Sequence, residues 1–292
     1  MVRPAAFGYN EQTEFSNAFQ QKASTSKKDI QQTAIREFDN LVNILVANGV
    51  GVVVYQDTVP PERPDAVFPN NWFSTHPDGT FVLYPMFAPN RRAERTPEAI
   101  KKILQVYEAR NTIDLTCYEV EGRYLEGTGS MVFDHSNHVA YVSRSVRTDA
   151  SLARELCARL GYECVLFSAT DEDGKPVYHT NVVLSIDEHL AIVCLDAITE
   201  NREEVLKRLR DGRKHIVYIT LDQMRKFAAN ALMLKNRYNE KLLVMSDAAF
   251  HSFTKEQKKI IMQTCKILHA PISTIEQTGG GSVRCMMAEL FI

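Results

Sequence analysis

The feature that most constrains the fold is an alternation of amphipathic helices and β-branched strands along the whole chain. The first helix is expected over Thr33–Asn48, where apolar residues recur at helical spacing, and Gly49 separates it from the strand Val50–Tyr55. The same order recurs with breaks near residues 49, 111, 161, 212 and 270. Five similar α/β modules would give this spacing, and so would an ordinary α/β fold that happens to alternate evenly. The later helix–strand pairs are Pro97–Arg110 and Ile113–Val120, Thr148–Leu160 and Cys164–Phe167, Glu203–Arg210 and His215–Thr220, and Thr254–Leu268 and Ile272–Glu276.

No linker interrupts this pattern. The 292 residues contain no stretch rich in Pro, Gly and Ser that separates two halves, and the densest loop, Asp57–Asp65, is short. A chain of this length buries a substantial core without disulfides or metals. We therefore predict a single domain over residues 1–292.

Composition and charge exclude several classes of protein. The net charge is −2, without the excess of Lys and Arg that binding to nucleic acid or an anionic membrane requires. Apolar runs such as Val50–Tyr55 are far shorter than the roughly 20 residues of a membrane span. Because the N-terminus shows no apolar signal segment, we expect a cytoplasmic protein that binds neither nucleic acid nor membranes.

One of the six cysteines follows an unusual loop, Gly279-Gly280-Gly281-Ser282-Val283-Arg284-Cys285. No two cysteines form a CxxC pair, so zinc ribbons and thioredoxin-type motifs are disfavoured, and most of the thiols are expected to be reduced core residues. The glycines allow close approach of the backbone to a ligand, which favours Cys285 as a nucleophile. The loop lacks the Lys and Ser/Thr of a phosphate-binding P-loop, which disfavours that alternative. A loose tail is also disfavoured, because the expected strand Met286–Phe291 is too apolar to stay in water.

A thiol nucleophile needs a proton carrier, and His179 is the best placed of the eight histidines. It precedes the apolar strand Val182–Ile186, so it would lie at the rim of a sheet, although a purely structural role is the alternative. His135 and His138 form an HxxH pair without a third ligand nearby, so we expect a solvated turn and no metal.

Three further polar segments are candidates for the site. The Gly-rich stretch Leu125–Ser130 carries Glu126, which could orient or deprotonate a catalytic group, although its glycines could also mark a β-bulge. Phe68–Phe73 places Asn71 among aromatic rings, as in a recognition patch or in a loop anchored by a buried Trp. The candidates for holding a carboxylate are Arg91, Arg92, Arg144 and Arg147.

Taken together, these segments resemble the amidinotransferase or guanidino-group-modifying superfamily, which includes arginine deiminase and dimethylarginine dimethylaminohydrolase. The segment Arg3–Asn10 and the pair Phe19-Gln20 are most similar to the bacterial citrulline-utilisation hydrolase branch. The resemblance spans most of the chain. It implies a five-bladed, pseudo-symmetric α/β propeller of ββαβ modules, also called a pentein, which agrees with the five breaks.

The resemblance also implies roles for individual residues. Cys285 matches the family's nucleophile, His179 in His179-Thr180-Asn181 its catalytic histidine, and Glu126 in Glu126-Gly127 its catalytic carboxylate. Arg147 lies in a segment similar to S-x-R-T and would bind the α-carboxylate of the substrate. Asn90–Glu94 resembles S-R-R-x-E, so either Arg91 or Arg92 would face the site.

Two departures from the family pattern concern the substrate. Deiminases carry an aspartate where this chain has Asn71, and arginine deiminases carry another where it has Asn181. Carboxylates suit a cationic guanidinium, whereas an amide can also donate to a carbonyl oxygen. The amides therefore favour a neutral ureido group, although amides also accept from guanidinium and Asp65 could supply charge.

The predicted function is a cysteine hydrolase that breaks a C–N bond of an arginine-related amino acid through a covalent thio-intermediate. The best candidate converts citrulline to ornithine, carbon dioxide and ammonia, with no cofactor and no metal. The partner is then a small-molecule amino acid, with a homodimer as one possible assembly. The alternatives are an arginine or methylarginine deiminase-type hydrolase, an amidinotransferase, and a non-catalytic binding protein on the same fold.

Overall fold

All five predicted helices form in the computed structural model, which describes residues 1–292, but their ends differ from the sequence-based bounds. Four of the five begin at a side-chain cap, because Ser26, Thr96, Asp149 and Thr254 each accept a hydrogen bond from the backbone N–H three residues further on. Gly161, in the left-handed conformation with φ 74°, ends the third helix where the sequence predicted. No helix is long and apolar enough to cross a membrane.

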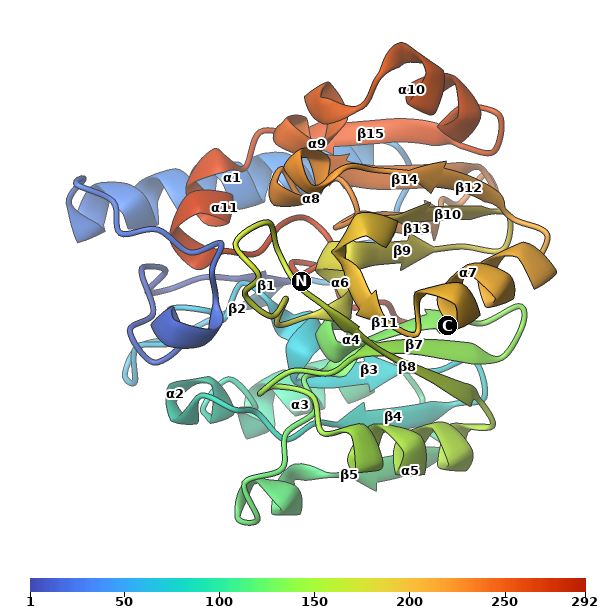
Figure 1. Ribbon diagram of the computed structural model, residues 1–292. Coiled ribbons are helices and arrows are strands. Elements are labelled where there is room, and N and C mark those ends of the chain that lie inside the picture. Colours follow the sequence, from blue (N-terminus) through green and yellow to red (C-terminus); the bar gives the residue numbers. More distant parts are fainter.

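The elements are labelled as in Figure 1. The helices are α1 (Lys27–Ala47), α2 (Pro89–Arg92), α3 (Pro97–Leu104), α4 (Gly127–Ser130), α5 (Ala150–Leu160), α6 (Thr180–Val183), α7 (Arg202–Asp211), α8 (Leu221–Arg225), α9 (Asp247–Ser252), α10 (Lys255–Ile261) and α11 (Ser273–Gly279). The strands are β1 (Val2–Arg3), β2 (Tyr55–Gln56), β3 (Phe73–Thr75), β4 (Thr80–Leu83), β5 (Asn111–Asp114), β6 (Met131–Asp134), β7 (Val139–Ser143), β8 (Glu163–Ala169), β9 (Leu184–Ile186), β10 (Leu190–Val193), β11 (Ile198–Glu200), β12 (His215–Tyr218), β13 (Leu232–Lys235), β14 (Lys241–Ser246) and β15 (Lys266–Ala270).

The strands form five sheets, and four of these share one plan. Two antiparallel strands are followed by a helical connection and by a third strand parallel to the second, in β3–β4–β5, β6–β7–β8, β9–β10–β12 and β13–β14–β15. Strand β11 adds to the edge of the second of these sheets, and the fifth sheet is the parallel pair β1–β2 around α1. The α/β class predicted from the alternation is therefore confirmed.

Several predicted strands are wrong, and each has a local reason. The strand Val50–Tyr55 is reduced to β2, because its partner β1 offers only two residues. The strand Ile113–Val120 stops at Asp114, whose side chain accepts the N–H of Thr116 and starts a turn. The helix predicted to reach Leu268 ends at Ile261, and β15 takes the residues after it.

The C-terminal segments differ most from expectation. The strand predicted over Ile272–Glu276 is wrong, because Ser273–Gly279 form α11, in which the Glu37 carboxylate on α1 accepts the N–H groups of Thr274 and Ile275 at 2.9 Å each. The expected strand Met286–Phe291 has no ladder partner. Side chains bind its backbone instead: Arg284 donates to Met287 O and Thr75 to Glu289 O.

The segments that carry the candidate site residues lie at the centre of the molecule. Helix α1 buries Phe38, Leu41 and Leu45 in the same apolar cluster as Val283 and Cys285. Figure 1 shows α5 and α10 at opposite edges of the molecule and the short turns α4 and α6 in its middle. These two turns contact each other and carry the Gly-rich and histidine segments singled out in the sequence.

We expect Lys214→Met to lower the free energy of unfolding by about 3 kcal/mol, because it leaves a buried Asp134 carboxylate without its charge partner. Lys214 Nζ lies 3.1 Å from Asp134 Oδ2, and both side chains are almost fully buried. Urea unfolding followed by circular dichroism measures the loss. The matched control, Lys207→Met at an exposed position on α7, should change stability by less than about 0.5 kcal/mol, and an equal loss in both variants would contradict the account.

Candidate active site

Four short segments bring the predicted site residues together: the 3₁₀ turn Pro69–Asn71, α4, α6, and the loop after α11. The turn α4 contacts both the 3₁₀ turn and α6. Thr180 fixes α6 in place, because its Oγ1 donates to Ser130 O at 2.5 Å and accepts the N–H of Ser143 at 2.7 Å. Since all three groups are buried, these bonds hold the histidine segment firmly against the glutamate segment.

Glu126 and His179 form a buried pair at the centre of this arrangement. His179 Nε2 lies 2.8 Å from Glu126 Oε2, and both side chains are almost fully buried. With Nε2–H donating to the carboxylate, Nδ1 carries the lone pair, and it has no hydrogen-bond partner within the protein. Burial lowers the pKa of His179, against the opposing effect of Glu126, so the ring is neutral at pH 7. A neutral imidazole with a free nitrogen can accept a proton.

The charge of Glu126 is balanced by several partners. Burial alone would raise the pKa of its carboxyl, but the Arg147 guanidinium and the His179 hydrogen bond outweigh burial and hold the pKa below its usual range. Arg147 Nη1 lies 3.5 Å from Oε2, and the backbone N–H of Phe87 donates to Oε1 at 3.1 Å. Glu126 therefore stays ionised and keeps the His179 ring oriented.

Cys285 lies almost fully buried between two asparagine amides. Its Sγ is 3.6 Å from Asn181 Nδ2 and 3.4 Å from Asn230 Nδ2. Asn181 was predicted as a site residue, but Asn230 was not. Asn230 follows two alanines in an apolar segment without a motif, so only its place in the fold reveals it.

Arg91, Asn71 and Asp65 form a second buried cluster. Arg91 Nη1 donates to Asn71 Oδ1 at 2.8 Å, and Arg91 also pairs with Glu94 and lies 3.7 Å from Asp65. Two buried atoms of this cluster have no partner: the donor Asn71 Nδ2 and the acceptor Asp65 Oδ1. Unpartnered buried polar atoms are costly, so both are suited to meet a substrate.

Of the two adjacent arginines, Arg91 faces this cluster. Arg92 is about one-third exposed and binds backbone carbonyls of Met86 and Phe87 instead. Arg147 is buried, with Nε and Nη2 donating to Ser16 Oγ at 3.1 and 2.8 Å and its guanidinium stacked over the Tyr178 ring. Arg144 lies away from these groups and pairs with Glu200 on the surface.

Gly129 allows the two clusters to meet. A Cβ added there would lie 2.5 Å from Asn71 Nδ2 and 2.7 Å from His179 Nδ1, closer than real contacts allow. The Asn71 amide and the His179 ring therefore pack directly against Gly129, which brings Asn71 Nδ2 and His179 Nδ1 close to each other.

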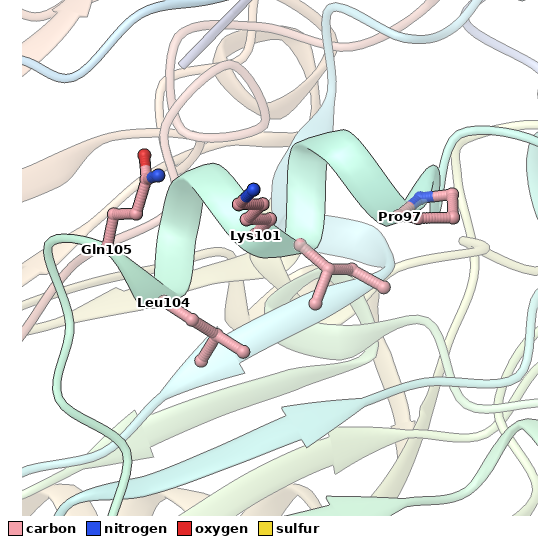
Figure 2. Close-up of a pocket in the computed structure, with 5 residues that line it drawn as sticks. Pro97, Lys101, Leu104 and Gln105 are labelled. Atoms are coloured by element: carbon pink, nitrogen blue, oxygen red, sulfur yellow. The ribbon is translucent and has the colours of Figure 1, made fainter.

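A cavity of about 970 Å³ has Thr128, Asn181 and Arg284 in its wall, whereas Cys285, His179 and Glu126 do not line it. Figure 2 shows a different, open hollow on α3, lined by Pro97, Ile100, Lys101, Leu104 and Gln105, and it contains none of the site residues. No group of three or more His, Cys, Asp or Glu side chains is arranged to hold a metal ion.

The match to a family model places this chain in the guanidino-group-modifying superfamily. The chain belongs to the family described as N,N dimethylarginine dimethylhydrolase, eukaryotic, whose sequence model matches residues 3–292. That is a family of hydrolases. No curated protein sequence matches the chain significantly.

Solved structures share the fold at low identity. The N-terminal domain of ArgZ, an arginine dihydrolase from the ornithine–ammonia cycle in cyanobacteria, is 17% identical with a TM-score of 0.73, and the match covers 100% of this chain and 98% of that domain. The chain spans 39% of the whole ArgZ chain. A dimethylarginine dimethylaminohydrolase is 18% identical with a TM-score of 0.63, covering 88% of this chain and 90% of that one. At these identities the likeness shows the fold alone.

We expect stability to fall as the pH is lowered, because His179 is buried in its neutral form. Burial lowers its pKa from 6.5 to about 4, so between these values the unfolded chain binds a proton that the folded chain does not. The contribution of neutral His179 to the free energy of unfolding is fully present above pH 6.5. Lowering the pH from 7 to 5 should reduce the free energy of unfolding by about 2 kcal/mol. Urea unfolding at both pH values measures it.

His179→Gln should flatten this pH dependence, since glutamine does not titrate. The control is His189→Gln, at an exposed histidine, which should leave the dependence unchanged. Equal slopes in the His179 variant and the wild type would contradict the assignment of the acid sensitivity to His179.

Proposed function

We propose that this protein hydrolyses a C–N bond in the neutral ureido group of an arginine-related amino acid, with citrulline as the best candidate. The observation that carries the proposal is the unpartnered donor of Asn71. Its Oδ1 is occupied by Arg91, which fixes the amide so that the unpartnered Nδ2 lies close to His179 Nδ1. A hydrogen-bond donor at that point needs an acceptor on the substrate.

A second unpartnered atom, the acceptor Asp65 Oδ1, also suits a ureido group. Asp65 Oδ1 is buried without a partner, and Asn10 donates to its other oxygen at 2.7 Å. A ureido group offers one carbonyl oxygen to accept and N–H groups to donate, so it satisfies both orphan atoms. A guanidinium has only donors and would leave Asn71 Nδ2 unsatisfied, which costs about 1–3 kcal/mol.

The reaction proceeds in two steps through a covalent intermediate. His179 takes the proton of the Cys285 thiol, the thiolate bonds to the ureido carbon, the bond from that carbon to the δ-nitrogen breaks, and His179 returns the same proton to the departing ornithine nitrogen. Water, deprotonated by His179, then attacks the S-carbamoyl carbon and frees the thiolate. The released carbamate decomposes to carbon dioxide and ammonia, so no redox partner or cofactor takes part.

The other end of the substrate would be held by Arg147. Its guanidinium is held by Ser16, from the exposed turn Glu14–Ser16, and this hydroxyl would give way to an α-carboxylate. Substrate binding at Arg147 would then place the ureido end beside Cys285.

The proposal also covers the arrangement of the sheets in the whole molecule. We propose that the five sheets close into a five-bladed propeller of one domain, with the β1–β2 sheet as the incomplete blade. A cytoplasmic location and a homodimer stay predictions from the sequence.

The second candidate is hydrolysis of arginine or methylarginine, as in the relatives named above. The Asp65 carboxylate supports it, because a buried acceptor next to the reacting group also suits a cationic guanidinium. An amidinotransferase would share the first step and pass the adduct to an amine instead of water. Amine acceptors such as glycine or ornithine would then yield transfer products.

The purified protein should release ornithine from L-citrulline and should turn over L-arginine more slowly, as followed by mass spectrometry of ornithine, citrulline and ammonia. Asn71→Asp removes the donor and adds a negative charge, so it should lower the ratio of kcat/KM for citrulline to that for arginine about 10-fold or more. Citrulline produced from arginine by the wild type, without ornithine from citrulline, would establish the second candidate instead.

The control for this assay is Cys285→Ser, which should abolish turnover of either substrate while circular dichroism stays unchanged. Turnover near the wild-type rate in this variant would overturn Cys285 as the nucleophile.

Gly129→Ala should reduce turnover about 100-fold, because its Cβ would displace the His179 ring or the Asn71 amide. Gly51→Ala is the matched control, since a Cβ at Gly51 has no atom within 4 Å. Unchanged activity in folded Gly129→Ala would show that turnover does not depend on the positions of the Asn71 amide and the His179 ring beside Gly129.

A further inference from the structure

Asn230 lies in the buried loop between α8 and β13, directly against the nucleophile. It is 0% exposed, and its Nδ2 lies 3.4 Å from Cys285 Sγ. The same nitrogen donates to the backbone carbonyl of Asn181 at 3.1 Å. The side-chain oxygen accepts the backbone N–H of Arg284, the residue before Cys285, at 3.1 Å.

The two backbone partners fix the orientation of the Asn230 amide. A carbonyl oxygen needs a donor and a backbone N–H needs an acceptor, so the nitrogen must face Asn181 and the oxygen must face Arg284. A primary amide carries two hydrogens on its nitrogen, and the Asn181 carbonyl uses one. The second is available to the sulfur.

The loop that carries Asn230 is itself held in place. The N–H of Asn230 donates to Phe227 O at 2.8 Å, and the N–H of Ala228 donates to Gln223 O at 3.0 Å. Ala228 and Ala229 are buried in the largest apolar cluster of the protein. The amide therefore reaches Cys285 from a rigid support.

The hydrogen-bonding neighbours of Cys285 Sγ are the amides of Asn181 and Asn230. Their Nδ2 atoms lie 3.6 and 3.4 Å from the sulfur, and their Oδ1 atoms, which can accept only from the protonated thiol, lie 4.0 and 3.6 Å from it. The Arg284 guanidinium is turned away, towards Met287 O and Glu289. The negative charge of a thiolate at this buried position is thus met by amide N–H groups and not by a cation in contact with it. Charge-assisted hydrogen bonds of this kind favour the ionised form of the acceptor.

We infer that Asn230 is a catalytic residue that donates an N–H to the Cys285 thiolate and joins the nucleophile loop to α6. The inference rests on the proposed role of Cys285 and adds the group that keeps its sulfur reactive. An aspartate at this position would keep the acceptor for the Arg284 N–H, but it would lose both donor bonds and place a carboxylate against the sulfur.

The test is the rate at which iodoacetamide alkylates Cys285 at pH 7.5, resolved from the exposed Cys117 by peptide mass spectrometry. Asn230→Asp should slow this alkylation about 10-fold or more, and Asn230→Ala, which removes the donor without adding charge, should slow it by a smaller factor. In the substrate assay, Asn230→Ala should lower kcat with little change in KM.

Asn236→Asp is the matched control, because Asn236 is another buried asparagine that donates to a backbone carbonyl, that of Asn48, away from the site. It should leave the alkylation rate of Cys285 unchanged. Wild-type alkylation rates in folded Asn230→Asp would overturn the inference, and if that variant does not fold, wild-type rates in Asn230→Ala would do so. Alkylation needs no substrate, so this outcome is separate from any failure of citrulline turnover.

Discussion

The buried charge of Glu126 is the constraint on which the rest of the site depends. An isolated carboxylate in the interior would cost several kcal/mol, so the fold surrounds it with compensating groups. Arg147, the His179 ring and the Phe87 N–H converge on its two oxygens. This arrangement fixes the histidine tautomer and leaves Nδ1 free to accept a proton.

A second principle of the site is that some polar atoms are satisfied and others are left for the substrate. Arg91 saturates Asn71 Oδ1, whereas Asn71 Nδ2 and Asp65 Oδ1 have no partner. The fixed protein contacts therefore decide which end of each polar group faces the reacting space. The proposed preference for a ureido over a guanidinium group rests on this pattern, because the two planar groups differ in one acceptor and in charge.

The sequence predicted the helices and strands whose ends are set by nearby residues. It did not predict those whose backbone is bound by side chains from distant segments. The helices α5 and α7 were expected from periodicity, and Gly161 marks the end of the first. The β-branched residues of Ile272–Glu276 predict a strand, but the Glu37 carboxylate caps this segment as part of helix α11. Likewise, the backbone at Met287 and Glu289 is bound by Arg284 and Thr75 instead of a neighbouring strand.

By itself, the sequence determined the α/β class and the candidate residues for the chemistry: a cysteine after a Gly-rich loop, a histidine before a strand and a glutamate in a Gly-rich turn. Motifs reveal such residues because the neighbouring glycines and apolar runs indicate the local backbone conformation. Only the tertiary structure decided that Asn230 touches Cys285, that Arg91 rather than Arg92 faces Asn71, and which atom of each amide is free. These are contacts between segments far apart in the chain, and hydrogen-bond partners become defined only when the segments pack together.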